Sequence, residues 1–261
     1  MRISENFYSI QGEGLRVGHP SVFVRFFGCN FRCPGFGLPP GQFSTEPDEI
    51  AKRADSFKSY SELPLAKTGC DSYPSWHPKF AKFSPDMTEE ELYEKLSVYH
   101  NTDLVLTGGE PLLPGTQRFL LSFFGRYSLD FKTVTFETNG TQLISSELVR
   151  LIGPKLILSI SPKLQCSGVP RDKAIIPDVI KSLCTHNAYL KFVVSSEADT
   201  EEIESILNET RVKNDVYIMP AGGTSELYNT NARAVCEFAM RKNFIFSPRL
   251  HIDLFGNSWG T

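Results

Sequence analysis

The sequence predicts an α/β fold made of six strand–helix units in a single domain spanning residues 1–261. A chain of 261 residues is longer than the usual domain of about 150 residues, but single α/β barrels often reach this size. Six short runs rich in Val, Ile, Leu and Phe alternate with helix-like segments, the pattern of parallel strands that are buried on both faces. Six units are two short of a closed eight-fold barrel. An open partial barrel and a doubly wound sheet therefore both fit the pattern.

Each expected strand is a short apolar run. These runs are residues 21–27, 103–107, 133–137, 156–160, 189–195 and 215–219. Helices are expected between them, near residues 88–99, 116–127, 145–152, 175–185, 199–208 and 225–242. Thr88 followed by Glu91 is a capping-box pattern that marks the start of the first of these helices.

Two segments depart from this alternation. Residues 34–87 contain eight prolines and are too long for an ordinary loop between a strand and a helix. We interpret this stretch as an insertion with one helix near residues 46–58. The tail, residues 247–261, is apolar and then contains glycine, and we expect it to form a short C-terminal extension.

Composition and charge exclude several classes of protein. Hydrophobic residues make up 41% of the chain and charged residues 22%, which excludes a largely disordered protein. The formal net charge of −3 gives no sign of binding to nucleic acid or to an anionic membrane. The N-terminus lacks the apolar segment of a secretory signal, and no apolar run approaches the ~18 residues of a membrane span. We therefore expect a cytoplasmic protein.

The cysteines favour a metal site over disulfides. Cys29 and Cys33 lie four positions apart, and the other four cysteines are scattered, at Cys70, Cys166, Cys184 and Cys236. In a reducing compartment, closely spaced cysteines more often bind metal or act in catalysis than form disulfides. Cys184 and Cys236 lie on apolar helix-like stretches and are expected to be packing residues.

Polar residues, glycines and prolines follow the ends of the expected strands. These positions are 28–29, 107–111, 137–140, 159–163, 195–196 and 219–220. Each one alone is equally consistent with a simple turn, because Gly, Pro and Asn-Gly are common turn formers. Since the carboxyl ends of parallel strands share one edge of the fold, we expect all of these positions to meet at one rim.

The first of these positions carries the sharpest motif. The sequence GCNFRC places three residues between Cys29 and Cys33. This spacing resembles the C-x3-C-x2-C motif of radical S-adenosylmethionine (SAM) enzymes, in which three thiolates hold a [4Fe–4S] cluster and the fourth iron binds SAM. Phe36 occupies the third position of that motif here, so the strict motif is broken.

Further segments resemble one branch of that superfamily, the 7-carboxy-7-deazaguanine synthases. They are residues 9–14 (SIQGEG), 18–20 (GHP), 23–30 (FVRFFGCN), 69–73 (GCDSY), 106–111 (LTGGEP), 137–140 (ETNG) and 161–163 (SPK). In that family the third cluster cysteine precedes Asp-Thr or Asp-Ser and then a Tyr, as Cys70 does here. The resemblance therefore implies a cluster on Cys29, Cys33 and Cys70 in a partial (β/α)6 radical SAM barrel. Residues 34–69 would be inserted in the cluster loop, since a long loop closes at modest entropic cost.

The resemblance implies a carbon–nitrogen lyase. The family converts 6-carboxy-5,6,7,8-tetrahydropterin to 7-carboxy-7-deazaguanine with loss of ammonia, in 7-deazapurine (queuosine-type) biosynthesis. It implies a [4Fe–4S] cluster, SAM and Mg²⁺ as cofactors, a flavodoxin- or ferredoxin-type reductant, and a homodimer. In such an enzyme the cofactors carry out the difficult chemistry, and the protein supplies binding, orientation and exclusion of water.

The resemblance also assigns the residues that bind SAM. They are Gly108, Gly109, Glu110, Glu137, Thr138, Asn139, Ser161 and Lys163. Glu110 is expected to accept hydrogen bonds from the SAM ammonium group. Lys163 is expected to pair with the SAM carboxylate.

The substrate and Mg²⁺ need a different set of partners. Arg25 is the expected cation for the substrate carboxylate, although a structural ion pair is its alternative role. Gln11 and Glu13 are expected to read the pterin edge, and His251 is a further candidate. The resemblance implies that Ser72, two residues after the third cysteine, is the Mg²⁺ ligand, since it keeps the hydroxyl of the family's Mg²⁺-binding Thr and Mg²⁺ prefers oxygen donors.

Three alternatives remain open at this point. A glycyl-radical activating enzyme is also a small partial barrel with a GGEP segment. A zinc-binding α/β module would use Cys29, Cys33, Cys70 and His77 as ligands. A non-catalytic relative would have lost the cluster together with the cysteine at position 36.

Overall fold

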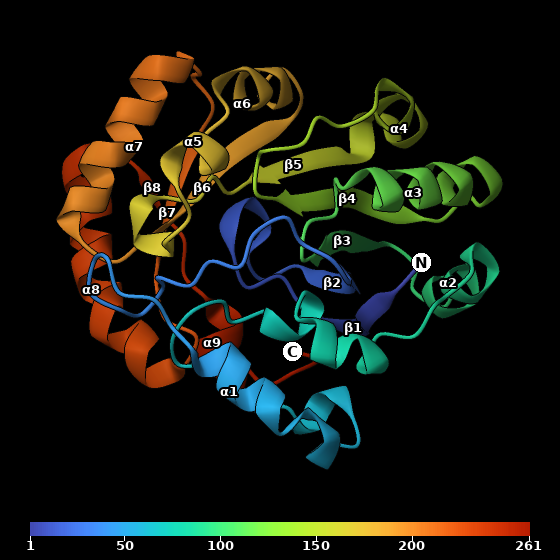
Figure 1. Ribbon diagram of the computed structural model, residues 1–261. Helices are drawn as coiled ribbons and strands as arrows, with labels where there is room; N and C mark the ends of the chain where they lie inside the picture. Colours follow the sequence, from blue (N-terminus) through green and yellow to red (C-terminus); the bar gives the residue numbers. More distant parts are fainter.

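A curved eight-stranded sheet forms the centre of the computed structural model, which describes residues 1–261 (Figure 1). Its strands are β1 (Ile3–Ile10), β2 (Pro20–Phe26), β3 (Thr102–Gly108), β4 (Phe131–Thr138), β5 (Leu156–Ile160), β6 (Ala188–Val194), β7 (Val216–Pro220) and β8 (Ile245–Phe246). β1 pairs antiparallel with β2, and every later pair is parallel.

The order of the strands in the sheet decides between the two expected architectures. The spatial order is β1-β2-β3-β4-β5-β6-β7-β8, the same as the order along the chain. A doubly wound sheet would reverse direction at a switch point, and this sheet does not. β8 does not pair with β1, so the fold is an open partial barrel, as in radical SAM enzymes.

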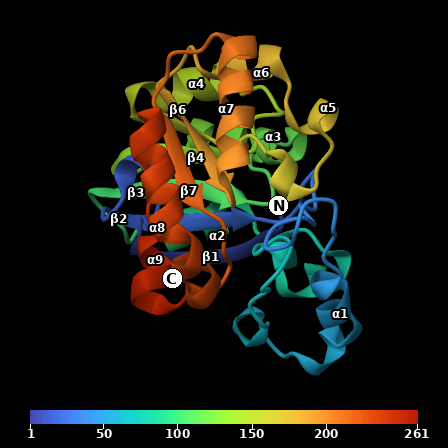
Figure 2. The same cartoon turned by 90° about the vertical axis from the view of Figure 1, so that its left-hand side faces the viewer.

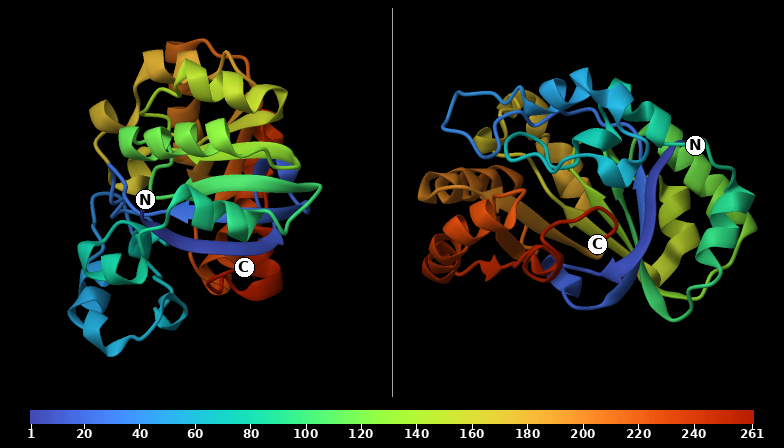
Figure 3. Two further views of the ribbon diagram at one scale, coloured as in Figure 1. Left: turned by 90° about the vertical axis from the view of Figure 1, so that its right-hand side faces the viewer. Right: turned by 90° about the horizontal axis from the view of Figure 1, so that it is seen from below.

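Helices cover the outer face of the curved sheet (Figure 3). They include α2 (Glu89–Leu96), α3 (Pro114–Arg126), α4 (Ser146–Ile152), α6 (Pro177–Leu183), α7 (Glu197–Thr210) and α8 (Ser225–Lys242). The short α5 (Arg171–Ala174) follows β5, and α9 (Leu250–Phe255) lies at the cavity, which His251 lines. The predicted capping box is confirmed, since Thr88 Oγ1 accepts from Glu91 N at 3.2 Å and Glu91 Oε2 accepts from Thr88 N at 2.7 Å. No helix has both the length and the apolar composition needed to cross a membrane.

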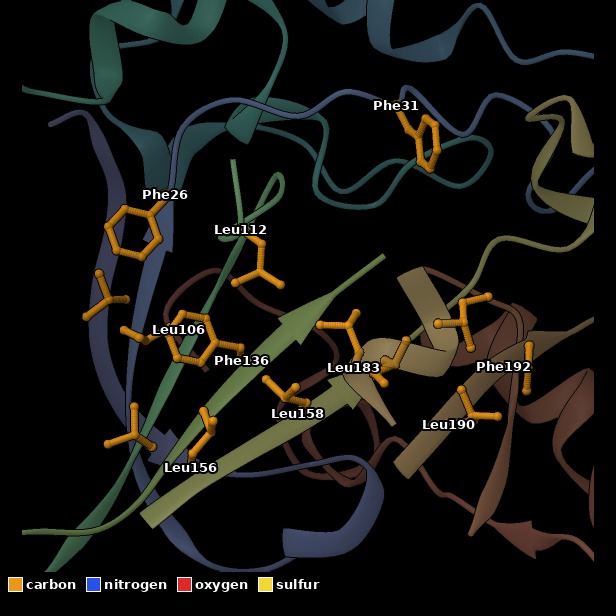
Figure 4. Close-up of a cluster of buried hydrophobic side chains, with 14 of the residues drawn as sticks. Phe26, Phe31, Leu106, Leu112, Phe136, Leu156, Leu158, Leu183, Leu190 and Phe192 are labelled. Atoms are coloured by element: carbon orange, nitrogen blue, oxygen red, sulfur yellow. The ribbon is translucent and has the colours of Figure 1, made fainter. Parts of the chain in front are cut away.

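Successive strand residues alternate between the outer and inner faces of the barrel. The outward side chains of β3, β4, β5 and β6 join the main hydrophobic core under the helices, for example Leu106, Phe136, Leu158 and Phe192 (Figure 4). The opposite faces of β2, β3, β4 and β6 carry Arg25, Thr107, Glu137 and Lys191, all of which line one cavity. The same alternation that builds the core therefore places polar groups inside the barrel.

The two flanking strands were not predicted from the sequence. β1 has half-buried residues on both faces and lacks a clear apolar alternation, and β8 has only two residues. β1 nevertheless extends the sheet beyond the six expected strands. It leads directly into the Gln11–Glu13 segment at the cavity.

The segment 34–87 lies beside the barrel as a separate packing unit (Figure 2). It contains α1 (Glu46–Lys52) and the short 3₁₀ helices Ala54–Ser56, Tyr60–Glu62, Tyr73–Ser75 and Pro78–Phe83. The helix expected near residues 46–58 thus ends at Lys52. The segment has a small core of its own, formed by Ile50, Ala51, Ala54, Leu63, Ala66, Tyr73 and Phe80.

The C-terminal tail is attached to this segment. The Trp259 ring packs edge-on against Tyr60, with a centroid distance of 5.1 Å. Trp259 Nε1 donates to the Leu63 carbonyl oxygen at 2.6 Å. Asn257 to Thr261 all line the cavity, so the tail closes one side of it.

Candidate active site

One cavity of about 250 Å³ gathers the residues that the sequence singled out. It lies at the carboxyl ends of the parallel strands, where the rim was expected. All the predicted site residues line it except Glu110. Gln11 and Glu13 reach it from the loop after β1, and His251 reaches it from α9.

Three thiols lie in this cavity, at Cys29, Cys33 and Cys70. Cys70 reaches the cavity because the two ends of the insertion, near residues 36 and 69, lie side by side. Gly69 N donates to the Phe36 carbonyl oxygen at 2.8 Å. The chain therefore returns beside the position where the third cysteine of the uninterrupted motif would stand.

A carboxylate in the insertion fixes this return. Glu46 Oε2 accepts hydrogen bonds from Lys67 N at 3.0 Å and Thr68 N at 2.8 Å. Glu46 belongs to the first turn of α1, so the helix predicted inside the insertion holds the segment that precedes Cys70. The intervening residues form an ordered support for the third thiol.

Burial raises the pKa of each of the three thiols. Burial raises the pKa of Cys29 to about 11 and that of Cys70 to about 12. Burial also raises the pKa of Cys33 well above the usual value. Thiols of this kind become thiolates when metal binding displaces their protons, and an all-sulfur donor set suits iron–sulfur clusters.

A zinc site that includes His77 is not formed. His77 Nε2 lies 3.1 Å from Asp48 Oδ1, and His77 Nδ1 accepts from Lys79 N at 3.2 Å. Both ring nitrogens are therefore occupied within the insertion, and His77 does not line the cavity. No three His, Cys, Asp or Glu side chains are grouped closely enough to hold a single metal ion.

The glycine pair after β3 permits close contact with the loop that carries Cys29. A Cβ atom on Gly109 would lie 1.8 Å from the Gly28 carbonyl oxygen, and Gly108 has a φ of +124°. Gly109 N donates to Phe26 O at 3.2 Å, and Glu110 N donates to Gly28 O at 2.8 Å. Only glycine lets the two segments approach this closely.

Glu110 differs from the expectation that it contacts SAM directly. Its side chain is fully buried and does not line the cavity. Oε1 accepts from Thr138 Oγ1 at 2.7 Å and from Leu112 N at 2.9 Å, and Oε2 accepts from Asn139 N at 2.7 Å. The Glu110 carboxylate therefore binds other groups of the protein and holds residues 138–139 against the loop after β3.

A second polar network joins the Cys29 loop to the rim after β4. Asn139 Nδ2 donates to Asn30 Oδ1 at 2.8 Å, and Asn30 Nδ2 donates to Thr141 Oγ1 at 2.9 Å. Asn30 was not predicted to have a role, although it follows Cys29 directly.

Lys163 has no carboxylate partner. Its Nζ contacts only Ser161 Oγ, at 3.1 Å.

Arg25 is in an ion pair and also lines the cavity. Its Nε lies 2.9 Å from Glu5 Oε2, and its Nη1 donates to Ser72 Oγ at 3.1 Å. Ser72 Oγ in turn lies 3.3 Å from Asp71 Oδ1. Arg25 therefore forms the structural ion pair that was its alternative role, and it also lines the cavity.

Sequence reasoning missed two buried cations. Lys191 Nζ lies 2.6 Å from Glu13 Oε2, and Arg249 Nε lies 3.0 Å from Glu13 Oε1. Burial alone would raise the pKa of Glu13, but these two cations hold it well below the usual value. Lys191 could have been found from the strand alternation, because it shares the inward face of β6 with Tyr189 and Val193. No local signal marks Arg249.

His251 packs against the backbone of Gly12. A Cβ atom on Gly12 would lie 2.0 Å from His251 Nδ1, so the glycine of SIQGEG makes room for the ring. His251 Nε2 lies 3.9 Å from Glu13 Oε1. Burial lowers the pKa of His251, which favours the neutral ring.

Comparison with known proteins identifies the family, although no protein-family model matches the chain. A 7-carboxy-7-deazaguanine synthase from Halobacterium salinarum is 34% identical over 275 residues, which cover 98% of this chain and 91% of the relative. The Pyrobaculum aerophilum synthase is 31% identical, covering 100% and 97%. QueE from Escherichia coli has a similar fold, with a TM-score of 0.56 at 20% identity over 94% of this chain and 92% of that one. The chain therefore belongs to the 7-carboxy-7-deazaguanine synthase family.

Proposed function

We propose that this protein is a radical SAM lyase that converts 6-carboxy-5,6,7,8-tetrahydropterin to 7-carboxy-7-deazaguanine and ammonia. Membership of the family carries a [4Fe–4S] cluster and SAM with it. The observation that carries the proposal is the single cavity lined by three thiols, the glycine-rich rim and a set of paired charges. When bound, the cluster and SAM supply the one-electron chemistry that removes a hydrogen atom from the substrate.

Cys29, Cys33 and Cys70 are the proposed cluster ligands. Their all-sulfur donor set and their shared position at the mouth of the barrel support this assignment. The polar network through Asn30 and Asn139 would hold the loop between β2 and Cys33 in place. The loop that carries two of the thiols is thereby fixed to the rim.

The rim residues are proposed to bind SAM. Lys163 is a cation without a carboxylate partner, which suits the SAM carboxylate. Gly108 and Gly109 expose backbone, and Glu137, Thr138, Asn139 and Ser161 present side-chain or backbone polar groups to the same cavity. Glu110 would contribute to SAM binding indirectly, by holding Thr138 and Asn139 in place.

The substrate is proposed to lie between the loop after β1 and the end of β2. Arg25 would receive its carboxylate and Gln11 and Glu13 its nitrogen-rich edge, beside His251. Ser72 is the proposed Mg²⁺ ligand, with the substrate carboxylate completing the site. Its hydroxyl already lies between Arg25 and Asp71, so it is held by charged neighbours on both sides.

The wider setting is proposed from family membership. The protein is a single cytoplasmic domain that acts as a homodimer and receives electrons from a flavodoxin or ferredoxin. It binds neither nucleic acid nor membrane. Its product feeds the synthesis of 7-deazapurine bases.

The proposed function is tested by an anaerobic assay. Reconstituted protein is mixed with SAM, Mg²⁺, dithionite and 6-carboxytetrahydropterin, and the expected product is 7-carboxy-7-deazaguanine. Formation of 5′-deoxyadenosine without deazaguanine would point to a different radical SAM substrate, such as the target of a glycyl-radical activating enzyme. Colourless protein that holds one zinc in place of about four irons would contradict the cluster.

A further inference from the structure

We propose that Lys191 and Arg249 are positioning residues that hold Glu13 as a fixed, ionised hydrogen-bond acceptor and thereby select substrates with an amino group beside a ring N–H. The inference rests on the proposed function and adds the determinant that distinguishes a 2-amino ring from a 2-oxo ring. Neither cation belongs to a motif that the family resemblance brought forward. Both line the cavity.

Each oxygen of the Glu13 carboxylate has its own cation. Lys191 Nζ lies 2.6 Å from Oε2, and Arg249 Nε lies 3.0 Å from Oε1. The Lys191 side chain is 5% exposed and that of Arg249 is 10% exposed, so water screens neither contact strongly. With one partner on each oxygen, the carboxylate cannot rotate without breaking a buried ion pair.

Each cation is in turn shared with a second carboxylate. Lys191 Nζ is 3.5 Å from Glu137 Oε1, and Arg249 Nη2 is 2.9 Å from Asp71 Oδ2. The chain of contacts therefore alternates in sign, from Glu137 through Lys191, Glu13 and Arg249 to Asp71. Three carboxylates and two cations leave one negative charge in excess, which favours a ligand edge rich in N–H donors.

The fixed charge state of Glu13 determines which edge it accepts. An ionised carboxylate has two oxygens with about four lone-pair sites and no proton to donate. With one site on each oxygen used by a cation, the remaining sites can accept two parallel N–H groups. A pterin presents such a pair in its 2-amino group and the neighbouring ring N–H. A 2-oxo ring places an oxygen opposite the carboxylate, which leaves buried acceptors unpaired.

The two cations differ in what else they hold. Lys191 joins Glu13 to Glu137, both inside the barrel. Arg249 joins Glu13 to Asp71, which directly follows Cys70. Loss of Lys191 should therefore disturb the substrate edge and Glu137 but not the cluster loop, whereas loss of Arg249 should also disturb the cluster loop.

The test measures binding without turnover. Cluster-loaded protein with SAM and no reductant is titrated with 6-carboxypterin and with 6-carboxylumazine, its 2-oxo counterpart, by ligand fluorescence. We expect the wild-type protein to bind the pterin at least about 100-fold more tightly. Lys191→Met should weaken pterin binding about 30-fold or more, as truncation of one partner of a buried charge pair does, and leave lumazine binding within about three-fold.

Lys242→Met is the matched control. Lys242 pairs with Glu204 at 3.0 Å on the outer helices, away from the cavity. This variant should retain the wild-type preference for the pterin. Iron content should remain unchanged in Lys191→Met, because Lys191 contacts no residue of the cluster loop, and should be diminished in Arg249→Met.

Each outcome decides the inference. If the role of Lys191 were purely structural, Lys191→Met would weaken the binding of both ligands equally. An unchanged preference for the pterin over the lumazine in Lys191→Met would therefore overturn the proposal. If Lys191→Met does not fold, Glu13→Gln replaces it in the test, because this change preserves the size of the side chain. Glu13→Gln should abolish the preference for the pterin over the lumazine. A Glu13→Gln protein that keeps this preference would overturn the proposal. If the wild-type protein binds neither ligand, the proposed function itself fails, and the inference fails with it.

Discussion

The backbone N–H of Gly69 donates to the carbonyl oxygen of Phe36 at 2.8 Å, and this bond joins the two ends of the insertion in the cluster loop. The bond explains how a chain without a cysteine at position 36 still brings a third thiol to the cavity. Cys70 follows the closing bond directly and is therefore placed by it.

Replacement of this thiol should abolish the cluster. Cys70→Ala removes one of three proposed ligands, so anaerobically reconstituted protein should fall from about four irons per chain to nearly none. Iron quantitation and electron paramagnetic resonance measure the change. Cys184→Ala is the control, because Cys184 is a half-buried thiol at the edge of the main core. Full iron retention in Cys70→Ala would show that the third ligand lies elsewhere.

The close approach of Gly109 to the Gly28 backbone predicts that an added methyl group at position 109 destabilises the protein. Gly109→Ala would place Cβ 1.8 Å from a backbone oxygen, and we expect a loss of about 3 kcal/mol in the free energy of unfolding. Gly125→Ala is the matched change, since nothing lies near its added Cβ on α3. It should stabilise the protein by up to about 1 kcal/mol. Denaturant unfolding compares the two, and equal stabilities would contradict the contact.

The Ser72 hydroxyl predicts how activity depends on Mg²⁺. Ser72→Ala removes the proposed oxygen ligand, so the Mg²⁺ concentration for half-maximal activity should rise about 10-fold or more. Ser72→Thr preserves the hydroxyl and should respond to Mg²⁺ like the wild-type protein. Activity assays across a Mg²⁺ series provide the measurement. Identical Mg²⁺ curves for Ser72→Ala and the wild-type protein would remove Ser72 from the metal site.

Trp259 should hold the insertion and the tail together. Trp259→Ala removes a partly buried hydrogen bond and the edge-on contacts with Tyr60 and Tyr73, at a cost of about 2 kcal/mol. The expected result is faster hydrogen exchange in residues 46–63 and at the tail. Leu254→Ala changes a side chain that is 58% exposed and should have little effect. Unchanged exchange in Trp259→Ala would show that the tail does not anchor the insertion.

The buried ring of His251 predicts a pH effect on stability. Burial lowers its pKa in the folded protein, so below about pH 6.5 the unfolded chain takes up a proton that the folded protein does not. The stability contributed by the neutral ring is therefore complete above pH 6.5 and declines as the pH falls. Anaerobic melting between pH 7.5 and 5.5 should show a smaller decline for His251→Gln. Parallel profiles would contradict the shift.

The sequence predicts most of the strands and the rim because both follow from short-range patterns. An apolar run such as 156–160 becomes a buried strand, and its carboxyl end lies beside those of its neighbours. Lys163 and Glu137 could be assigned to one site from the order of residues alone, because each follows or ends such a strand. β1 escaped prediction because its residues are half-buried on both sides.

The remaining features depend on contacts between distant residues. Glu110 stands in a motif that suggests a ligand contact, yet its oxygens are taken up by Thr138, Asn139 and Leu112. Arg249 lies in a tail without strand or helix periodicity, and its partner Glu13 is 236 positions away. No local pattern encodes such a pair, since it exists only after the barrel has formed.

This separation also sets the order in which the protein matures during translation. Glu13 leaves the ribosome before either of its two cations, which follow 178 and 236 positions later. The Glu13 carboxylate therefore lacks one or both of its partners until the chain has been synthesised through Arg249. The part of the cavity wall that Glu13 forms with Lys191 and Arg249 is therefore completed only after Arg249 has been synthesised.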